Sequence, residues 1–219
     1  MDVDLIVRTT PFFLQAALIT VVVSALSLVL GLAMGFGAAL AKLSANPLLR
    51  HPANAYVSVI RGTPALIQIF LIYFGGPQVG IHLDAFTAGI LGLGINIGAY
   101  MTESIRGAIV AVAPGQADAA RALGFRPMPI MALITLPQAA RLMIRPLGIN
   151  AIALVKGSAL VSAISVVELT YTAQRYLSST YQPLEIFLVS GSLYLAIVTA
   201  MIWCIDRLDE RYALKTART

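Results

Sequence analysis

The sequence predicts an all-α membrane protein that consists of a single transmembrane domain, residues 1–219, with about five spans. Of its 219 residues, 58% are hydrophobic and only 11% are charged, whereas soluble domains average about 25% charged residues. The mean hydropathy is +0.85. A membrane span needs about 20 apolar residues, so the chain is long enough for five spans joined by short loops. The single cysteine, Cys204, excludes an internal disulfide and is expected to face lipid.

Five apolar runs define the expected spans. The fourth is long and contains an interruption, and a pair of glycines in the first, Gly31 and Gly35, has a spacing that favours close helix packing. In chain order the runs cover residues 12–41, 56–74, 86–112, 128–166 and 186–205.

Basic residues fall in three segments that lie on one side of the membrane if there are five spans. Because positive charge collects on the cytoplasmic side, the N-terminus is expected outside and the C-terminus in the cytoplasm. The net charge of +5 does not indicate nucleic-acid binding, since the cations are spread over loop ends. These cations are Lys42 and Arg50 in the first loop, Arg121 and Arg126 in the third, and Arg207, Arg211, Lys215 and Arg218 in the tail.

Residues 114–126 are expected to form a short cytoplasmic helix between the third and fourth spans. Pro114 suits the first helical position, and Asp118 and Arg121 are placed as the helix dipole favours. Gly124 can adopt the left-handed conformation that ends a helix. A helix of about ten residues is not stable alone, so this one needs a surface on which to dock. Its alanines, 117, 119, 120 and 122, give it a low profile. An ordinary connecting loop is the alternative.

The third span carries polar side chains at spacings that place them on one helical face. These are Asn96, Tyr100 and Glu103, with Gly92 and Gly107 extending the stripe. Glu103 would lie about 6 Å past the midpoint of the span, at a rise of about 1.5 Å per residue. An acid there costs about 2.5 to 3.5 kcal/mol on insertion scales. It is therefore expected to meet a cationic or amino-bearing solute, or else to pair with Arg106.

The fourth span is interrupted at Lys156, Gly157 and Ser158, where an exposed backbone could hold a solute. Lys156 could offset a substrate carboxylate, pair with an acid, or extend to the outer interface. Glu168 is expected at the outer surface, where it could face a binding-protein partner or the mouth of a path.

Several motifs are absent from the sequence. It has no G-x-x-x-x-G-K-[ST] run, and so no expected ATP hydrolysis by this chain, and it has no H-E-x-x-H and no convincing Ser/His/Asp set. His51 and His82 lack companion ligands. The chain is expected to be neither an enzyme nor a holder of a cofactor or metal.

Asp118-Ala119-Ala120, Gly124 and the later Ile134-x-Leu136-Pro137 resemble the cytoplasmic-loop signature of bacterial ABC importer permeases. Two further stretches, Arg61-Gly62-Thr63-Pro64 and residues 96–109, resemble the polar amino-acid branch of that family. Residues 180–183 are similar to permeases for histidine, lysine, arginine, ornithine and opines. Residues 156–160 depart from the usual pattern at Gly157.

This resemblance implies a multi-pass permease subunit in a bacterial inner membrane, paired with itself or with a sister permease. Two copies of a separate ATPase subunit, which binds the ATP, and an external solute-binding protein would complete the importer. An ion-coupled secondary transporter or channel using Glu103, and a membrane subunit without transport, are the alternatives. The implied ATPase-coupling residues are Gly115, Asp118, Ala119, Ala120, Arg121 and Gly124. The implied substrate path contains Asn96, Tyr100, Glu103, Lys156 and Ser158.

Overall fold

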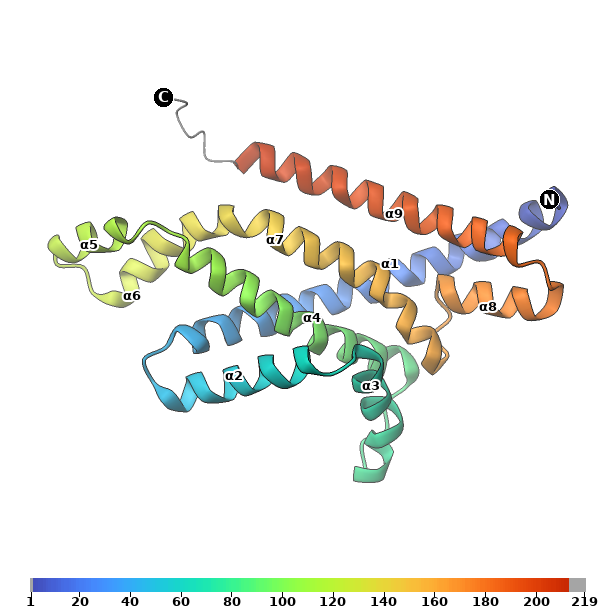
Figure 1. Ribbon diagram of the computed structural model, residues 1–219, viewed down its shortest axis with the longest axis horizontal. Helices are drawn as coiled ribbons and strands as arrows, with labels where there is room; N and C mark the ends of the chain where they lie inside the picture. Colours follow the sequence, from blue (N-terminus) through green and yellow to red (C-terminus); the bar gives the residue numbers. More distant parts are fainter. Residues whose placement is uncertain (1, 213–219) are drawn as a thin grey trace.

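The computed structural model describes residues 2–212, and every regular element in that range is helical (Figure 1). Short π- and 3₁₀-helical segments, labelled η, adjoin α3 and both ends of α7. The α-helices are α1 (Val3–Leu43), α2 (Pro47–Gly62), α3 (Ala65–Phe70), α4 (Ala85–Val110), α5 (Pro114–Ala122), α6 (Pro127–Pro129), α7 (Leu136–Gly157), α8 (Leu169–Thr180) and α9 (Pro183–Tyr212).

Four helical stretches in the described residues are long and apolar enough to cross a membrane: Val3–Leu43, Ala85–Val110, Pro127–Ile164 and Pro183–Tyr212. The expected second span, residues 56–74, is wrong in its start and in its continuity. Helix α2 already begins at Pro47, where Asn46 Oδ1 accepts a hydrogen bond from Leu48 N at 2.9 Å. The segments Pro47–Gly62 and Ala65–Val79 then meet at an angle of 108°. Together they make a fifth span only if the bent pair is counted as one.

The bend follows from Pro64. The residue before a proline is displaced from the helical region, and Thr63 is extended, with φ −122° and ψ 149°. Pro64 also lacks the N–H that would continue the helical hydrogen bonds. After the bend, α3 runs into a π-helical turn, η1 (Leu71–Gly75), and a 3₁₀ turn, η2 (Gly76–Val79).

Helices α1 and α4 pack closely through glycines, as the Gly31 and Gly35 spacing predicts. A Cβ added to Gly35 would lie 2.9 Å from Met101 Cβ and 3.1 Å from the carbonyl oxygen of Gly98. These separations are shorter than an ordinary van der Waals contact. The absence of side chains at these positions therefore permits the helices to approach.

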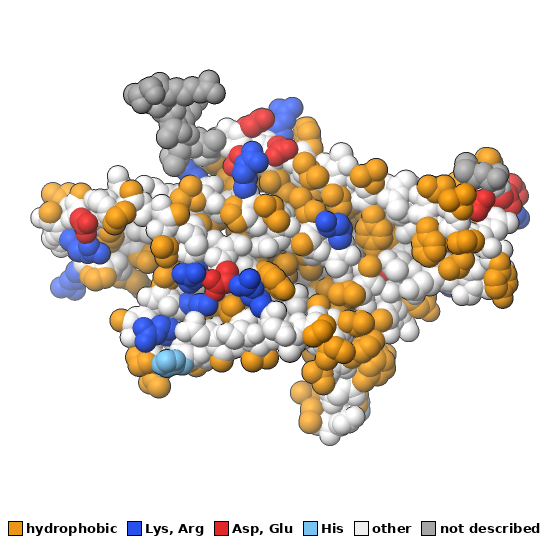
Figure 2. Space-filling view, in the orientation of Figure 1, with side chains coloured by type: hydrophobic (Ala, Val, Ile, Leu, Met, Phe, Trp, Pro, Cys, Tyr) orange, Lys and Arg blue, Asp and Glu red, His pale blue; other side chains and the backbone are white. Residues whose placement is uncertain are grey.

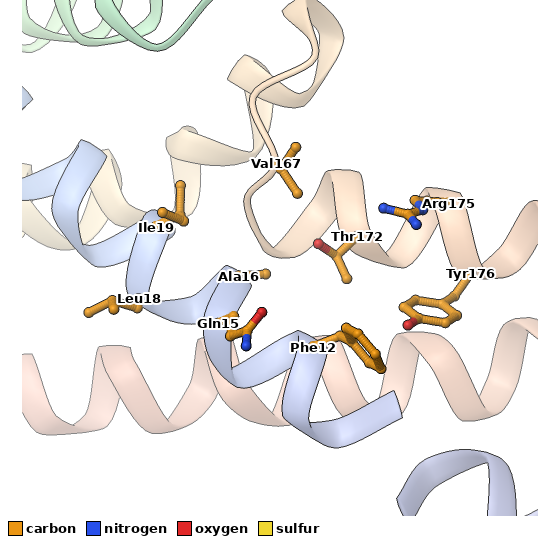
Figure 3. A pocket seen from close by; sticks show the side chains of 9 residues that line it. All are labelled: Phe12, Gln15, Ala16, Leu18, Ile19, Val167, Thr172, Arg175 and Tyr176. Carbon is orange, nitrogen blue, oxygen red and sulfur yellow. The ribbon is translucent and has the colours of Figure 1, made fainter. Parts of the chain in front are cut away.

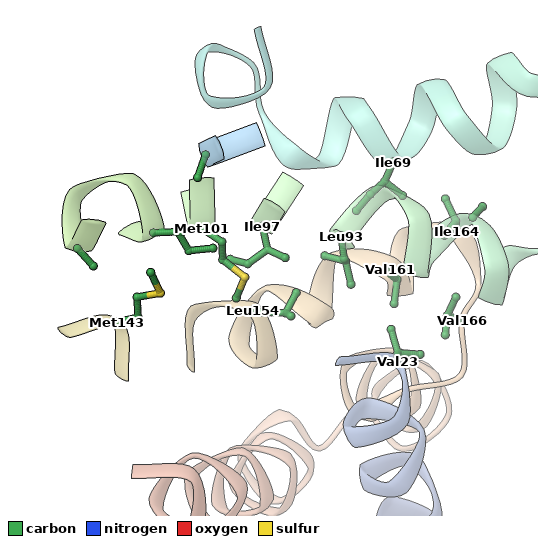
Figure 4. Close-up of a cluster of buried hydrophobic side chains, with 14 of the residues drawn as sticks. Val23, Ile69, Leu93, Ile97, Met101, Met143, Leu154, Val161, Ile164 and Val166 are labelled. Atoms are coloured by element: carbon green, nitrogen blue, oxygen red, sulfur yellow. The ribbon is translucent and has the colours of Figure 1, made fainter. Parts of the chain in front are cut away.

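The main hydrophobic core lies where α1, α3, α4 and α7 meet. Val23 of α1, Ile69 of α3 and Leu93 and Met101 of α4 are almost wholly buried. Figure 4 shows these side chains pointing toward the same interior as Leu154 of α7. A second cluster joins the first turns of α1 to α8 and α9, so that both ends of the bundle are anchored.

The fourth span is interrupted, as predicted. It begins with α6 and a π-helical turn, η3 (Ile130–Thr135), continues as α7, and changes after Gly157 into a 3₁₀ segment, η4 (Ser158–Ile164). That segment ends at Ser165, whose φ is +68°. After α6, the fourth span therefore consists of three successive segments of π-, α- and 3₁₀-helix.

Figure 1 shows α5, the α1–α2 turn and the C-terminal part of α9 toward one end of the molecule, and α8 with the N-terminus at the other. The basic segments around Lys42, Arg121 and Arg207 thus share one end, as the five-span topology requires. The cytoplasmic assignment of this end stays a prediction. Lys215 and Arg218 lie outside the described residues. Cys204 is exposed on α9.

Candidate functional site

The predicted polar stripe lies along the more accessible face of α4. Asn96 and Glu103 are partly exposed and Tyr100 is exposed, whereas Ile97, between them in the sequence, is buried. Gly107 is exposed and continues the stripe. Gly92, which the sequence also placed on this face, is buried and does not belong to it. A Cβ on Gly92 would lie 2.7 Å from Ile69 Cγ1, so that glycine serves the contact with α3.

Asn96 and Tyr100 line a cavity of about 200 Å³ between α3, α4 and α7. Its polar lining comes from Asn96, Tyr100 and Asn150, and Gly157 lies on its wall. Asn150 Nδ2 donates to Ser104 Oγ at 2.9 Å, which links the cavity wall on α7 to α4. Pockets for drug-sized ligands usually measure about 300–1,000 Å³. This cavity therefore suits a small solute, or one part of a larger path.

Gln68 orients Asn96 and also stabilises the bend between α2 and α3. Its Nε2 lies 2.8 Å from the carbonyl oxygen of Ile60 and 2.8 Å from Thr63 Oγ1. Its Oε1 accepts from Asn96 Nδ2 at 3.0 Å. The buried Gln68 side chain thus satisfies backbone groups released by Pro64 and fixes an amide of the cavity at the same time.

Glu103 is held by two cations. Oε2 accepts from Arg106 Nε at 3.0 Å, which is the pairing expected as one alternative. Oε1 accepts from Lys42 Nζ, at the last turn of α1. The side chains of Lys42, Glu103 and Arg106 are 16%, 24% and 38% exposed. Figure 2 shows blue and red side chains together in the region of α2 and α4.

The structure does not bring Lys156 and Ser158 to this cavity. Lys156 is exposed. Ser158 is fully buried, and its Oγ donates to the carbonyl oxygen of Val155 at 2.7 Å. Neither lines the cavity, whereas their neighbour Gly157 does.

Glu168 is not at the outer surface, contrary to the expectation. It is fully buried because it caps α8: its Oε1 accepts from Tyr171 N at 2.8 Å, and its Oε2 accepts from Tyr194 Oη at 2.8 Å. Burial raises the pKa of this carboxyl group, and the hydrogen bonds from the Thr170 backbone and from Tyr194 lower it in part. Glu168 therefore ties α8 to α9.

A groove of about 360 Å³ lies at the same end of the molecule, between α1 and α8. Figure 3 shows that Phe12 and Gln15 reach it from α1, and Thr172, Arg175 and Tyr176 from α8. It shares no lining residue with the cavity beside Asn96, so the two are separate sites.

Helix α5 forms where the sequence predicts, but it ends at Ala122 and not at residue 126, because the chain turns at Gly124. Pro114 is its first residue, and Gly124 has φ +81°. Phe125 N donates to the Ala120 oxygen at 3.1 Å and Gly124 N to the Arg121 oxygen at 2.9 Å, which is the Schellman termination. Asp118 forms an ion pair with Arg121, and both side chains are 65% exposed.

The surface of α5 is almost entirely free. Within it only Ala120 is buried and only Ala117 is half-buried, while Gly115, Asp118, Ala119 and Arg121 are exposed. Apolar side chains stand out on either side of the following turn, Leu123 at 78% and Met128 at 79% exposed. Exposed apolar groups around a short helix are typical of an interaction surface.

A family model described as "Binding-protein-dependent transport system inner membrane component" matches residues 27–214, which is most of the chain. The chain belongs to this family. It is an ABC-transporter permease, a multi-pass membrane subunit and not an enzyme. An importer of this kind also includes an ATPase subunit and a solute-binding protein.

Curated relatives agree with the permease assignment. The nopaline transport system permease protein NocM of Agrobacterium fabrum is 37% identical over 207 residues, which cover 90% of this chain and 86% of the relative. The glutamine transport system permease protein GlnP of Escherichia coli is 34% identical over 203 residues, which cover 92% of this chain and 93% of the relative.

Solved structures carry the same fold. The crystal structure of an amino acid ABC transporter with histidines contains a chain with TM-score 0.90 and 36% identity, covering 96% of the permease and 99% of that chain. A chain of the MetNI methionine ABC transporter in an inward-facing conformation has TM-score 0.82 at 22% identity, covering 94% of the permease and 99% of that chain.

Sequence reasoning on the permease missed Asn150, which lines the cavity. It also missed three residues that contact the polar stripe of α4: Lys42 at Glu103, Arg61 at Tyr100 and Gln68 at Asn96. Gln68 and Asn150 each stand alone in an apolar run, and that isolation was the available signal. Lys42 and Arg61 lie near helix ends, where cations are ordinary, so only the fold reveals their neighbours.

Proposed function

We propose that this chain forms part of the translocation path of an ATP-driven importer for polar amino acids or opines, in a bacterial inner membrane. The resemblance at residues 180–183 favours basic amino acids within that class. The relatives named for nopaline and glutamine support amino acids and opines in general. Two permease subunits, identical or sister chains, are expected to assemble with two ATPase subunits and an external solute-binding protein.

In this proposal the cavity beside Asn96 and Tyr100 belongs to the path. A cavity of about 200 Å³ with amide and phenol groups can bind a small polar solute. The path would be completed across the axis between the two permease subunits. Lys156 and Ser158 stay proposed path residues, although their side chains do not line this cavity. In the proposal they take part through their backbone, where α7 changes into η4.

Helix α5 is the proposed coupling helix. The observation that carries the proposal is a well-terminated helix whose surface is exposed around Asp118, Ala119 and Arg121, in a family whose importers include an ATPase. ATP-driven movement of the ATPase would displace α5 as a rigid lever. The permease pair would then change between inward-facing and outward-facing packings, which is a shift in the populations of two states.

Asp118→Lys tests the docking. The Asp118–Arg121 pair is exposed and contributes little to folding, so the variant is expected to insert and assemble normally. A charged contact with the ATPase is worth about 1.5–3 kcal/mol, so its reversal should reduce ATP-driven uptake by about tenfold or more. The assay is uptake of labelled amino acids by proteoliposomes that contain the permease, ATPase and binding protein.

Asp4→Lys is the matched control. Asp4 pairs with Arg8 at 3.0 Å in the first turns of α1, also exposed, at the opposite end of the molecule. It should leave uptake unchanged. Wild-type uptake by the Asp118→Lys complex would refute the role of α5 in coupling, and an absence of any ATP-dependent uptake by the wild type would refute the function itself.

A further inference from the structure

Four charged side chains from three helices contact or belong to residues 100–106 of α4. Glu103 and Arg106 lie on α4 itself, Lys42 of α1 pairs with Glu103, and Arg61 of α2 lies over the Tyr100 ring. Glu103 uses one carboxylate oxygen for Lys42 and the other for Arg106, with Arg106 Nη2 also 3.0 Å from Oε2. Both oxygens are therefore occupied by cations of the chain itself. A cationic solute would have to displace one of them.

Arg61 has a different environment. Its Cζ lies 5.1 Å from the centroid of the Tyr100 ring, a cation–π contact. Tyr100 is 39% exposed and lines the cavity, so Arg61 contacts a residue of the cavity wall. The side chain is exposed, and among the described residues, which include all ten acids of the sequence, it forms no ion pair.

The balance of charge is positive. The four groups carry three positive charges and one negative charge, and only Lys42 and Arg106 pair with Glu103. A guanidinium does not lose its proton to relieve the excess. Uncompensated charge is costly in a membrane, and charged groups there usually have a partner or serve a translocated species. The cavity lining itself offers only neutral polar groups, from Asn96, Tyr100 and Asn150. Lys42 and Arg106 both pair with Glu103, so Arg61 is the cation of this group that is free to bind an anion from outside the chain.

We propose that Arg61 binds a carboxylate of the transported solute, and that Glu103 is a positioning residue held by Lys42 and Arg106. The guanidinium fork matches a carboxylate in a bidentate arrangement, and stacking on Tyr100 limits its orientations. The inference rests on the proposed function, but it departs from the preference for basic amino acids that the resemblance at residues 180–183 favours. The site prefers amino-acid derivatives of zero or negative net charge over cationic amino acids.

The test measures solute binding to the permease–ATPase complex in nanodiscs without the binding protein, so that the permease alone selects. The probes are labelled glutamate, glutamine and arginine, which differ in net charge. The wild type should bind glutamate or glutamine more tightly than arginine. Arg61→Gln should weaken the binding of glutamate and glutamine by about tenfold or more. Arg61→Lys should restore part of this binding, because lysine keeps the positive charge but lacks the two-pronged guanidinium group.

Arg50→Gln is the control, because Arg50 is an exposed cation on the same helix, α2, at its other end. It should bind all three solutes as the wild type does. Tightest binding of arginine by the wild type would overturn the proposal, and so would unchanged glutamate and glutamine binding by Arg61→Gln. If Arg61→Gln fails to assemble with the ATPase, the wild-type order of the three solutes decides.

The two proposals can fail separately. If the full complex takes up amino acids with ATP but Arg61→Gln binds them normally, only the role of Arg61 is wrong. If the wild-type complex takes up none of the three solutes and no other amino acid, the proposed function fails.

Discussion

Glu168 shows how a single buried acid can organise one end of this bundle. Its carboxylate caps α8 and accepts from Tyr194 of α9, while the Leu169 N–H donates to Thr20 Oγ1 of α1 at 3.2 Å. Thr170 Oγ1 lies 3.0 Å from Tyr194 Oη and extends the network. Hydrogen bonds thus join α1, α8 and α9 around the buried carboxylate of Glu168.

The raised pKa of Glu168 predicts a pH dependence of stability. A carboxyl whose folded pKa exceeds its unfolded value of about 4.3 binds protons more tightly when folded. The contribution of this group to the free energy of unfolding is fully present below the unfolded pKa, and it is lost as pH rises through the folded pKa. In thermal unfolding of the purified complex, the wild type should lose stability relative to Glu168→Gln over that range.

Glu210→Gln is the control for this pH dependence, since Glu210 is exposed near the end of α9. It should keep the wild-type dependence on pH. Parallel curves for the wild type and Glu168→Gln would contradict the assigned burial effect.

At the residue scale, sequence patterns predicted the side chains that follow a helical repeat and missed those placed by tertiary contacts. Asn96, Tyr100 and Glu103 were identifiable because positions three and four apart share a helical face. Glu168 was misplaced because a polar residue after an apolar run resembles a surface residue. Its partner Tyr194 is 26 positions away, and no local pattern reports such a distance.

At the element scale, the packing of α1 on α4 depends on glycines that look alike in the sequence but differ in the fold. Gly35 faces the backbone of Gly98, whereas a Cβ on Gly37, two residues on, would have no atom within 4 Å. The glycine spacing predicted close packing, but the partner helix could only come from the structure.

Gly35→Val is expected to destabilise the permease by about 1–3 kcal/mol, because the larger side chain overpacks the α1–α4 contact. Gly37→Val introduces the same side chain into open space on the same helix and should have a much smaller effect. The measurement is the thermal unfolding midpoint of each purified complex. Equal losses for the two variants would show that helix propensity, and not packing, governs α1.

The second span shows where element prediction failed. Hydropathy alone joins residues 56–74 into one run, but Pro64 divides the stretch, and the two parts meet at 108°. The Pro64 signal was in the sequence. The sequence did not show which side chain would bond to the polar groups that the bend leaves without helical partners. Gln68 does so, by hydrogen bonds to the Ile60 carbonyl oxygen and to Thr63 Oγ1.

At the scale of the whole molecule, α5 has little support from the rest of the chain, since Ala120 is its only buried residue. It projects at one end of the bundle (Figure 1), and nearly all of its nine residues are exposed. Solvent-exposed backbone hydrogen bonds with few buried contacts open readily. Pro114 at its first position and the hydrogen bonds of its termination specify its helical shape, while its stability is expected to come from a partner.

Amide hydrogen exchange should reveal this dependence. In the permease without the ATPase, the amides of residues 117–123 are expected to exchange fast, and in the full complex they should be strongly protected. The amides in the middle of α4, which are buried by α1 and α7, serve as the internal reference and should change little. Equal exchange of α5 in both samples would contradict its burial against the ATPase.

Cys204 gives the molecule one native thiol, on the exposed side of α9. A fluorophore or spin label can therefore be attached there without first removing other cysteines. A second label introduced on α5 would define one distance within each labelled subunit. That distance would follow the displacement of the projecting helix against its own scaffold throughout a nucleotide cycle.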